Sequence, residues 1–120
     1  MVNWNWEESD RFGTTFKRYE KKHPNELKAL LANLDKYLCA LQQCGNPLQI
    51  KAGFIHNEPQ GIKALDQSGG AQRHKLKEVR LYIFPSIENK VLHLLIIGDK
   101  TSQQEDINFS KDYLKKLKRG

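Results

Sequence analysis

The hydrophobic positions of this chain recur with two different periods, and the longer period predicts three helices. Apolar residues lie three or four positions apart, as on one face of a helix, in residues 10–22, 25–44 and 102–117. Pro24 separates the first two segments, because the residue before a proline disfavours helical backbone, and Gly45 ends the second. We therefore expect a helical hairpin and, near the C-terminus, one further helix.

Polar residues at the start of two of these segments support the helix boundaries. Ser9 or Asp10 can cap the first helix by accepting a hydrogen bond from its first turn. Ser102 and Glu105 fit a capping box, in which each side chain bonds the backbone N–H of the other residue. The last helix should therefore run from Ser102 through Leu117, with its lysines in solvent.

The shorter period predicts strands. Apolar and polar residues alternate in residues 2–6 and 75–84, as in strands with one buried face. Residues 91–97 are apolar except for His93, which predicts a central strand covered on both sides and a buried, hydrogen-bonded histidine. Residues 47–74 are punctuated by glycine and proline, so we expect loops there and at most one weak strand.

Length and composition narrow the class of protein. A chain of 120 residues has room for one domain, residues 1–120, and the mixture of helices and strands makes it α+β. The net charge of +6 favours a polyanionic partner such as nucleic acid or an acidic protein. No apolar run is long enough for a membrane span, and the N-terminus lacks a signal-peptide pattern, so we expect a cytoplasmic protein without membrane contact.

The cysteines and glycines indicate no bound cofactor. Cys39 and Cys44 lie in one predicted helix, where we expect reduced, partly buried thiols. A zinc site would have to recruit His56 or His74, and the cysteine spacing is looser than in zinc sites. No glycine-rich segment has the lysine and the setting of a phosphate-binding loop. We therefore expect neither a metal nor a nucleotide cofactor.

The C-terminal half resembles the RelE/ParE toxin superfamily, and within it the phage-derived HigB-like branch. The family pattern is a strand with a Leu-x-Glu-Leu-Arg or Tyr-Arg-x-x-Tyr signature, a hydrophobic strand, Lys-Lys-Thr, and a helix that opens with Glu-Ile. The counterparts here are Leu76-Lys77-Glu78-Val79-Arg80-Leu81-Tyr82, residues 91–97, Asp99-Lys100-Thr101 and Asp106-Ile107.

This resemblance implies a fold and a function. The fold would be a RelE-like small antiparallel sheet packed against an N-terminal helical hairpin, with a short C-terminal helix. The function would be that of the toxin of a type II toxin–antitoxin system, a ribosome-dependent mRNA endoribonuclease. The implied partners are an antitoxin protein, mRNA and the ribosome, and a homodimer is left open.

RNA cleavage without a metal uses the 2′-hydroxyl as nucleophile, so the protein must bind the phosphate, neutralise charge and move two protons. Arg80 is our main candidate, because a guanidinium binds phosphate bidentately and stays protonated. Strand alternation places Glu78 and Tyr82 beside Arg80, where Glu78 can act as a general base and the ring of Tyr82 can stack on a nucleobase. His74 joins them as a general acid if the alternation extends back to residue 74. We expect support for phosphate binding from Arg73, Lys77, Lys100, Lys115 and Lys118.

Each candidate also has a structural alternative. Arg80 could form a surface salt bridge with Glu78, Tyr82 could simply fill the sheet face, and His74 could be a solvated loop residue. The lysines of the last helix could be an ordinary solvated face. Trp4 and Trp6 could stack on bases, but the alternation favours partial burial in the core.

Two departures from the family pattern favour a second hypothesis for function. The strand that contains Arg80 carries one arginine where family members usually have two. Asp99 stands in place of the first lysine of the Lys-Lys-Thr pattern. The alternative is therefore a non-catalytic nucleic-acid or protein-binding module of the same fold, with ParE-like inhibition of DNA gyrase as a variant. A third alternative is a domain whose charge serves only solubility. The sequence leaves open whether the protein is an enzyme.

Overall fold

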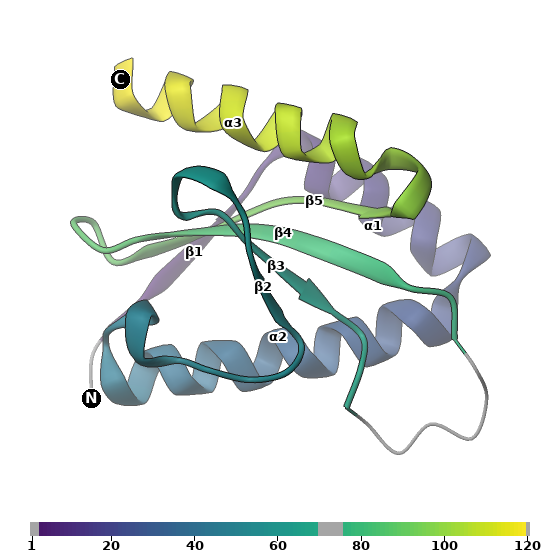
Figure 1. Ribbon diagram of the computed structural model, residues 1–120, viewed down its shortest axis with the longest axis horizontal. Helices are drawn as coiled ribbons and strands as arrows, with labels where there is room; N and C mark the ends of the chain where they lie inside the picture. Colours follow the sequence, from purple (N-terminus) through teal and green to yellow (C-terminus); the bar gives the residue numbers. More distant parts are fainter. Residues whose placement is uncertain (1–2, 70–75, 120) are drawn as a thin grey trace.

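The computed structural model describes residues 3–69 and 76–119 as an α+β fold with one sheet between helices (Figure 1). Helix α3 covers one face of the sheet, and α1 and α2 cover the other. The elements follow the expected order, with additional short strands and turns of 3-10 helix (η): β1 (Asn5–Glu8), α1 (Asp10–Lys22), α2 (Pro24–Cys44), η1 (Pro47–Gln49), β2 (Ile55–Asn57), η2 (Pro59–Gly61), β3 (Lys63–Asp66), β4 (Val79–Ser86), β5 (Val91–Asp99), η3 (Lys100–Ser102) and α3 (Gln103–Arg119).

The sheet has five strands in the order β1-β5-β4-β3-β2. Strands β2 to β5 pair antiparallel, but β1 pairs parallel with β5, with Asn5 opposite Val91 and Glu8 opposite Leu94. The expected antiparallel sheet is therefore wrong at this edge, and the sheet is mixed. Parallel neighbours need a long connection, which the helical hairpin and the intervening strands supply.

The expectation of loops and at most one weak strand in residues 47–74 is wrong, because this segment contains both β2 and β3. Strand β3 pairs with β2 on one side and β4 on the other, so it lies inside the sheet. Strands of three and four residues are too short to display a hydrophobic period, and the surrounding glycines and prolines favoured loops. The neighbouring strand β4 begins at Val79 rather than at residue 75.

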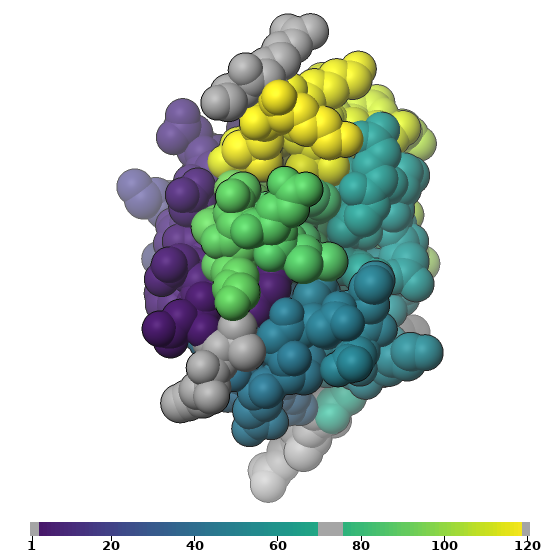
Figure 2. Space-filling view, turned by 90° about the vertical axis from the view of Figure 1, so that its left-hand side faces the viewer, coloured from purple at the N-terminus to yellow at the C-terminus, as the bar shows by residue number. Residues whose placement is uncertain are grey.

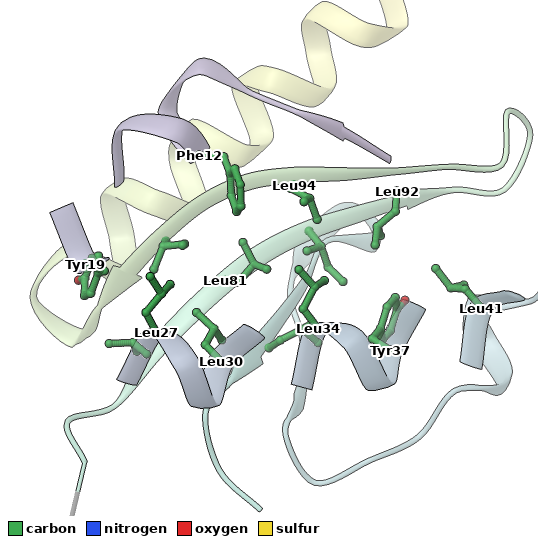
Figure 3. Close-up of a cluster of buried hydrophobic side chains, with 14 of the residues drawn as sticks. Phe12, Tyr19, Leu27, Leu30, Leu34, Tyr37, Leu41, Leu81, Leu92 and Leu94 are labelled. Atoms are coloured by element: carbon green, nitrogen blue, oxygen red, sulfur yellow. The ribbon is translucent and has the colours of Figure 1, made fainter. Parts of the chain in front are cut away.

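The larger core lies between the sheet and the helical hairpin (Figure 3). The predicted apolar stripe of α2 is buried at Leu27, Leu30, Leu34 and Leu41, and Tyr37 joins it. It packs against the predicted inner face of β4, and against α1 and β5; the partners include Phe12, Tyr19, Val79, Leu81, Ile83, Leu92 and Leu94. The predicted buried face of this strand is confirmed, and it meets the helical hairpin.

A smaller core lies between the sheet and α3. It contains Leu114 of α3 together with strand residues of the opposite face, namely Ile62, Ala64, Tyr82, Leu95 and Ile96. Strand β5 contributes to both cores, as its nearly continuous apolar run predicted. None of the helices described has the length and apolarity that a bilayer crossing requires.

The helix caps agree with the sequence at two ends and differ at a third. Ser9 accepts a hydrogen bond of 3.0 Å from the backbone of Phe12, and Gly45 ends α2 with a left-handed φ of 70°. The capping box predicted for Ser102 and Glu105 is wrong. It forms one turn earlier, between Asp99 and Ser102, because η3 precedes α3.

Three expectations about individual side chains need correction. Strand β1 starts at Asn5, and all four of its residues are exposed at the sheet edge. Trp4 is buried as expected, but Trp6 is 55% exposed. Cys39 and Cys44 are free and exposed rather than partly buried, because they lie on the solvent side of α2.

Candidate functional site

Polar side chains gather at the end of the sheet where β3 stops, β4 starts and β5 leads into η3. Antiparallel pairing places Asp66 opposite Arg80, and Arg80 opposite Gly98, two residues before Lys100. His56 of β2 and Glu78, which precedes β4, complete the group. We call His56, Asp66, Glu78, Arg80 and Lys100 the polar cluster.

Arg80 and Glu78 form an ion pair within this cluster. The Nη2 and Nε atoms of Arg80 donate to Glu78 Oε1 at 3.1 and 3.3 Å. Lys100 Nζ lies 3.7 Å from the other carboxylate oxygen of Glu78. The structural alternative for Arg80, a salt bridge with Glu78, is therefore present. Because a guanidinium has five N–H donors, this pairing leaves others with which Arg80 can bind an anion.

His56 and Asp66 form a second pair. Nε2 of His56 lies 2.6 Å from Oδ2 of Asp66, and Oδ1 accepts hydrogen bonds from the backbone N–H and the hydroxyl of Ser68. Burial would raise the pKa of Asp66, but the hydrogen bonds from Ser68 and His56 outweigh it and lower the pKa below 3.8. The carboxylate is therefore ionised at neutral pH and holds the imidazole in one orientation.

The two pairs are close enough to act on one ligand. The ligating atoms of His56, Asp66 and Glu78 all lie within 4.8 Å of one another. The side chains of His56 and Glu78 are about one-third exposed, whereas that of Asp66 is nearly buried. The cluster thus combines two cations that can bind a phosphate with an imidazole and carboxylates that can accept a proton.

Lys77 does not join the polar cluster. Its ammonium group lies 2.8 Å from Oδ2 of Asp99, whose Oδ1 caps η3 by accepting from Thr101. Burial would raise the pKa of Asp99, but Lys77 and Thr101 lower it well below its ordinary value. Burial and Asp99 together raise the pKa of Tyr19 to about 12. The aspartate that departs from the family pattern therefore anchors the start of the last helix.

Tyr82 lies on the same face as Arg80, but α3 covers it. Its side chain is only 1% exposed and packs in the smaller core, and burial raises its pKa. The structure supports the alternative that Tyr82 fills the sheet face, because a buried ring has no surface for a nucleobase.

The remaining candidates lie apart from the cluster or outside the described residues. Lys115 and Lys118 are exposed near the C-terminal end of α3, roughly 20 Å along the helix from Lys100. Arg73 and His74 lie outside the residues that the structure describes.

A groove of about 880 Å³ lies at the opposite end of the sheet, beside the β4–β5 hairpin and the end of α3 (Figure 2). His93 lines it and is buried as predicted, stacked on Phe84 and edge-on to Tyr113. Its Nδ1 has no hydrogen-bond partner among the described residues, so the predicted hydrogen bond is not formed there; Glu7 Oε2 lies 3.8 Å away. Burial lowers the pKa of His93, although Glu7 opposes the shift. The imidazole is therefore neutral at neutral pH.

Sequence reasoning missed His56 and Asp66 as members of the site. They are ten residues apart in a segment that we expected to be loops, and their contact depends on the pairing of β2 with β3. The one available signal was the short stretch at residues 62–65, apolar except for Lys63, which is followed by Asp66 and marks β3.

This chain has no match among protein-family models, curated proteins or solved structures. We therefore infer its function from the polar cluster itself.

Proposed function

We propose that the protein is an endoribonuclease that cleaves mRNA on the ribosome and serves as the toxin of a type II toxin–antitoxin system. The single observation that carries this proposal is the convergence of the His56–Asp66 pair with Arg80, Glu78 and Lys100. The order of strand, helical hairpin, antiparallel strands and terminal helix also agrees with the resemblance to HigB-like toxins. An antitoxin that covers the basic surface would keep the enzyme inactive.

The polar cluster has the groups that RNA cleavage by the 2′-hydroxyl requires. The hydroxyl oxygen attacks phosphorus, the bond from phosphorus to the 5′-oxygen breaks, and a 2′,3′-cyclic phosphate remains. His56 donates a hydrogen bond from Nε2 to the Asp66 carboxylate, which orients the ring, and accepts the proton of the 2′-hydroxyl on Nδ1. Arg80 binds the phosphate and stabilises the charge that develops in the transition state. Lys100, whose side chain is 79% exposed, stabilises the negative charge on the leaving 5′-oxygen, which takes its proton from solvent water.

The surface charge supports binding to ribosomal RNA. The net charge is +6, and Lys115, Lys116 and Lys118 are exposed on α3. Lysines that neutralise RNA phosphates release counterions, so binding should weaken steeply as the salt concentration rises. A cytoplasmic location is part of this proposal, because the ribosome is the site of action.

Growth after induced expression in bacteria tests the proposal. Wild type should arrest growth, and Arg80→Ala should relieve the arrest at equal protein level. Arg18→Ala removes the same charge from an exposed position on α1, outside the polar cluster, and should arrest growth like wild type. Harmless overexpression of the wild type at good yield would contradict the proposal.

One observation favours a non-catalytic nucleic-acid or protein-binding module instead. Arg80 is engaged by Glu78 and Lys77 by Asp99, so two of the expected phosphate-binding residues already have acidic partners. Salt-dependent RNA binding without any cleavage would support this second function.

A further inference from the structure

We infer that His56, Asp66 and Glu78 form a binding site for a divalent transition metal ion, of which Zn²⁺ is the best-matched member. Their three donor atoms lie within 4.8 Å of one another, and the closest two, Nε2 of His56 and Oδ2 of Asp66, are 2.6 Å apart. Around a tetrahedral Zn²⁺, donors at 2.0–2.1 Å from the metal lie roughly 3.3 Å from each other. Small side-chain adjustments therefore bring all three atoms into the first coordination sphere.

The surroundings hold two of the donors in place. His56 and Asp66 belong to β2 and β3, which pair with each other, and Glu78 directly precedes β4, the next strand. The backbone N–H and the hydroxyl of Ser68 both donate hydrogen bonds to Oδ1 of Asp66. The other oxygen, Oδ2, faces His56. Such outer hydrogen bonds to a ligating carboxylate fix its orientation.

The donor set selects among metals. One imidazole nitrogen and two carboxylate oxygens suit Zn²⁺, with a fourth position open to water or substrate. Mg²⁺ prefers six oxygen ligands and keeps several of its waters, so this site should not bind it with comparable affinity.

Arg80 and Lys100 oppose metal binding, because both contact the carboxylate of Glu78. A metal ion has to displace Arg80 from Glu78 and overcome the repulsion of two nearby cations. Two kinds of substitution should therefore change the metal affinity in opposite directions. Removal of the Arg80 charge should tighten metal binding, whereas removal of a ligand should weaken it.

Metal binding has a consequence that rests on the proposed function. When Zn²⁺ binds Nε2 of His56, the proton of the neutral imidazole moves to Nδ1, the atom that would accept the proton of the 2′-hydroxyl, so Zn²⁺ should inhibit RNA cleavage. Binding itself is measured without RNA, so failure of this inference and failure of the proposed function are distinguishable.

Isothermal titration of the full chain with ZnCl₂ tests the inference. The background is Cys39→Ser/Cys44→Ser, which removes the exposed thiols as competing ligands. One Zn²⁺ should bind per chain. His56→Gln and Glu78→Gln should each weaken binding at least about 10-fold, Arg80→Gln should strengthen it, and His23→Gln, which removes a histidine outside the cluster, should leave it unchanged.

Thermal unfolding without metal checks that each variant is folded. If His56→Gln does not fold, the Zn²⁺ affinity of Glu78→Gln decides the test. The inference is overturned if no Zn²⁺ binds, if binding is lost with the two cysteines, or if it survives in both ligand variants. Binding of Mg²⁺ as tight as that of Zn²⁺ would also contradict the donor assignment.

Discussion

Gly98 of β5 lies directly against Asp106 of α3, with no room for a side chain between them. A Cβ atom at residue 98 would overlap with the carboxylate of Asp106 and the hydroxyl of Ser102. Asp106 is buried and accepts a hydrogen bond of 2.8 Å from Ser102. Burial, together with Asp99 and Glu105, raises the pKa of Asp106. This contact sets how closely the start of α3 approaches β5, the strand that leads into Lys100 of the polar cluster.

We expect Gly98→Ala to lower the free energy of unfolding by about 1–3 kcal/mol, because the added methyl group must displace α3. Gly13→Ala is the matched control: a Cβ there meets nothing within 4 Å, and alanine in helix α1 should stabilise by about 0.5–1 kcal/mol. Urea denaturation of both variants measures the two effects. Equal stability of wild type and Gly98→Ala would show that the contact is looser than described.

Asp99→Asn should be more destabilising at neutral pH than in acid. The pKa of Asp99 is lowered in the folded protein, so its charge stabilises the fold above its ordinary pKa of 3.8, and this contribution is lost as the pH falls below that value. The difference in unfolding free energy between wild type and variant should therefore shrink from neutral pH toward about pH 2. A difference that does not depend on pH would contradict the role of the Lys77–Asp99 pair.

His56→Gln should reduce RNA cleavage by about 100-fold or more, the usual contribution of a positioned proton-transfer group. The side chain is about one-third exposed, so the fold should tolerate the change. Single-turnover cleavage rates at saturating protein measure the effect apart from binding. Cleavage at the wild-type rate would remove His56 from the mechanism.

Tyr82→Phe should leave cleavage unchanged, in contrast to His56→Gln. The ring is buried beneath α3, so the loss of its hydroxyl does not alter the surface that meets RNA. The same single-turnover assay applies, with thermal unfolding as a check on folding. A large loss of activity in a stably folded Tyr82→Phe protein would mean that the ring becomes exposed when RNA binds.

Long periodic segments were predictable from the sequence, whereas short strands and their contacts were not. The leucines of α2 repeat over 21 residues, and the alternation in β4 separated the buried face from the face that bears Glu78 and Arg80. His56 and Asp66 lie on strands of three and four residues, where no period can be read. Tyr82 was assigned to the correct face, but its burial depends on where α3 packs, which is a tertiary property.

The most direct test of the central claim is cleavage of a ribosome-bound mRNA by purified wild type and Arg80→Ala, with the ends of the products identified. We predict fragments that end in a 2′,3′-cyclic phosphate, a rate about 100- to 1000-fold lower for Arg80→Ala, and no cleavage where the 2′-hydroxyl at the cut site is replaced by hydrogen. Intact mRNA with wild type, or equal cleavage by the variant, would contradict the assignment of catalysis to the polar cluster.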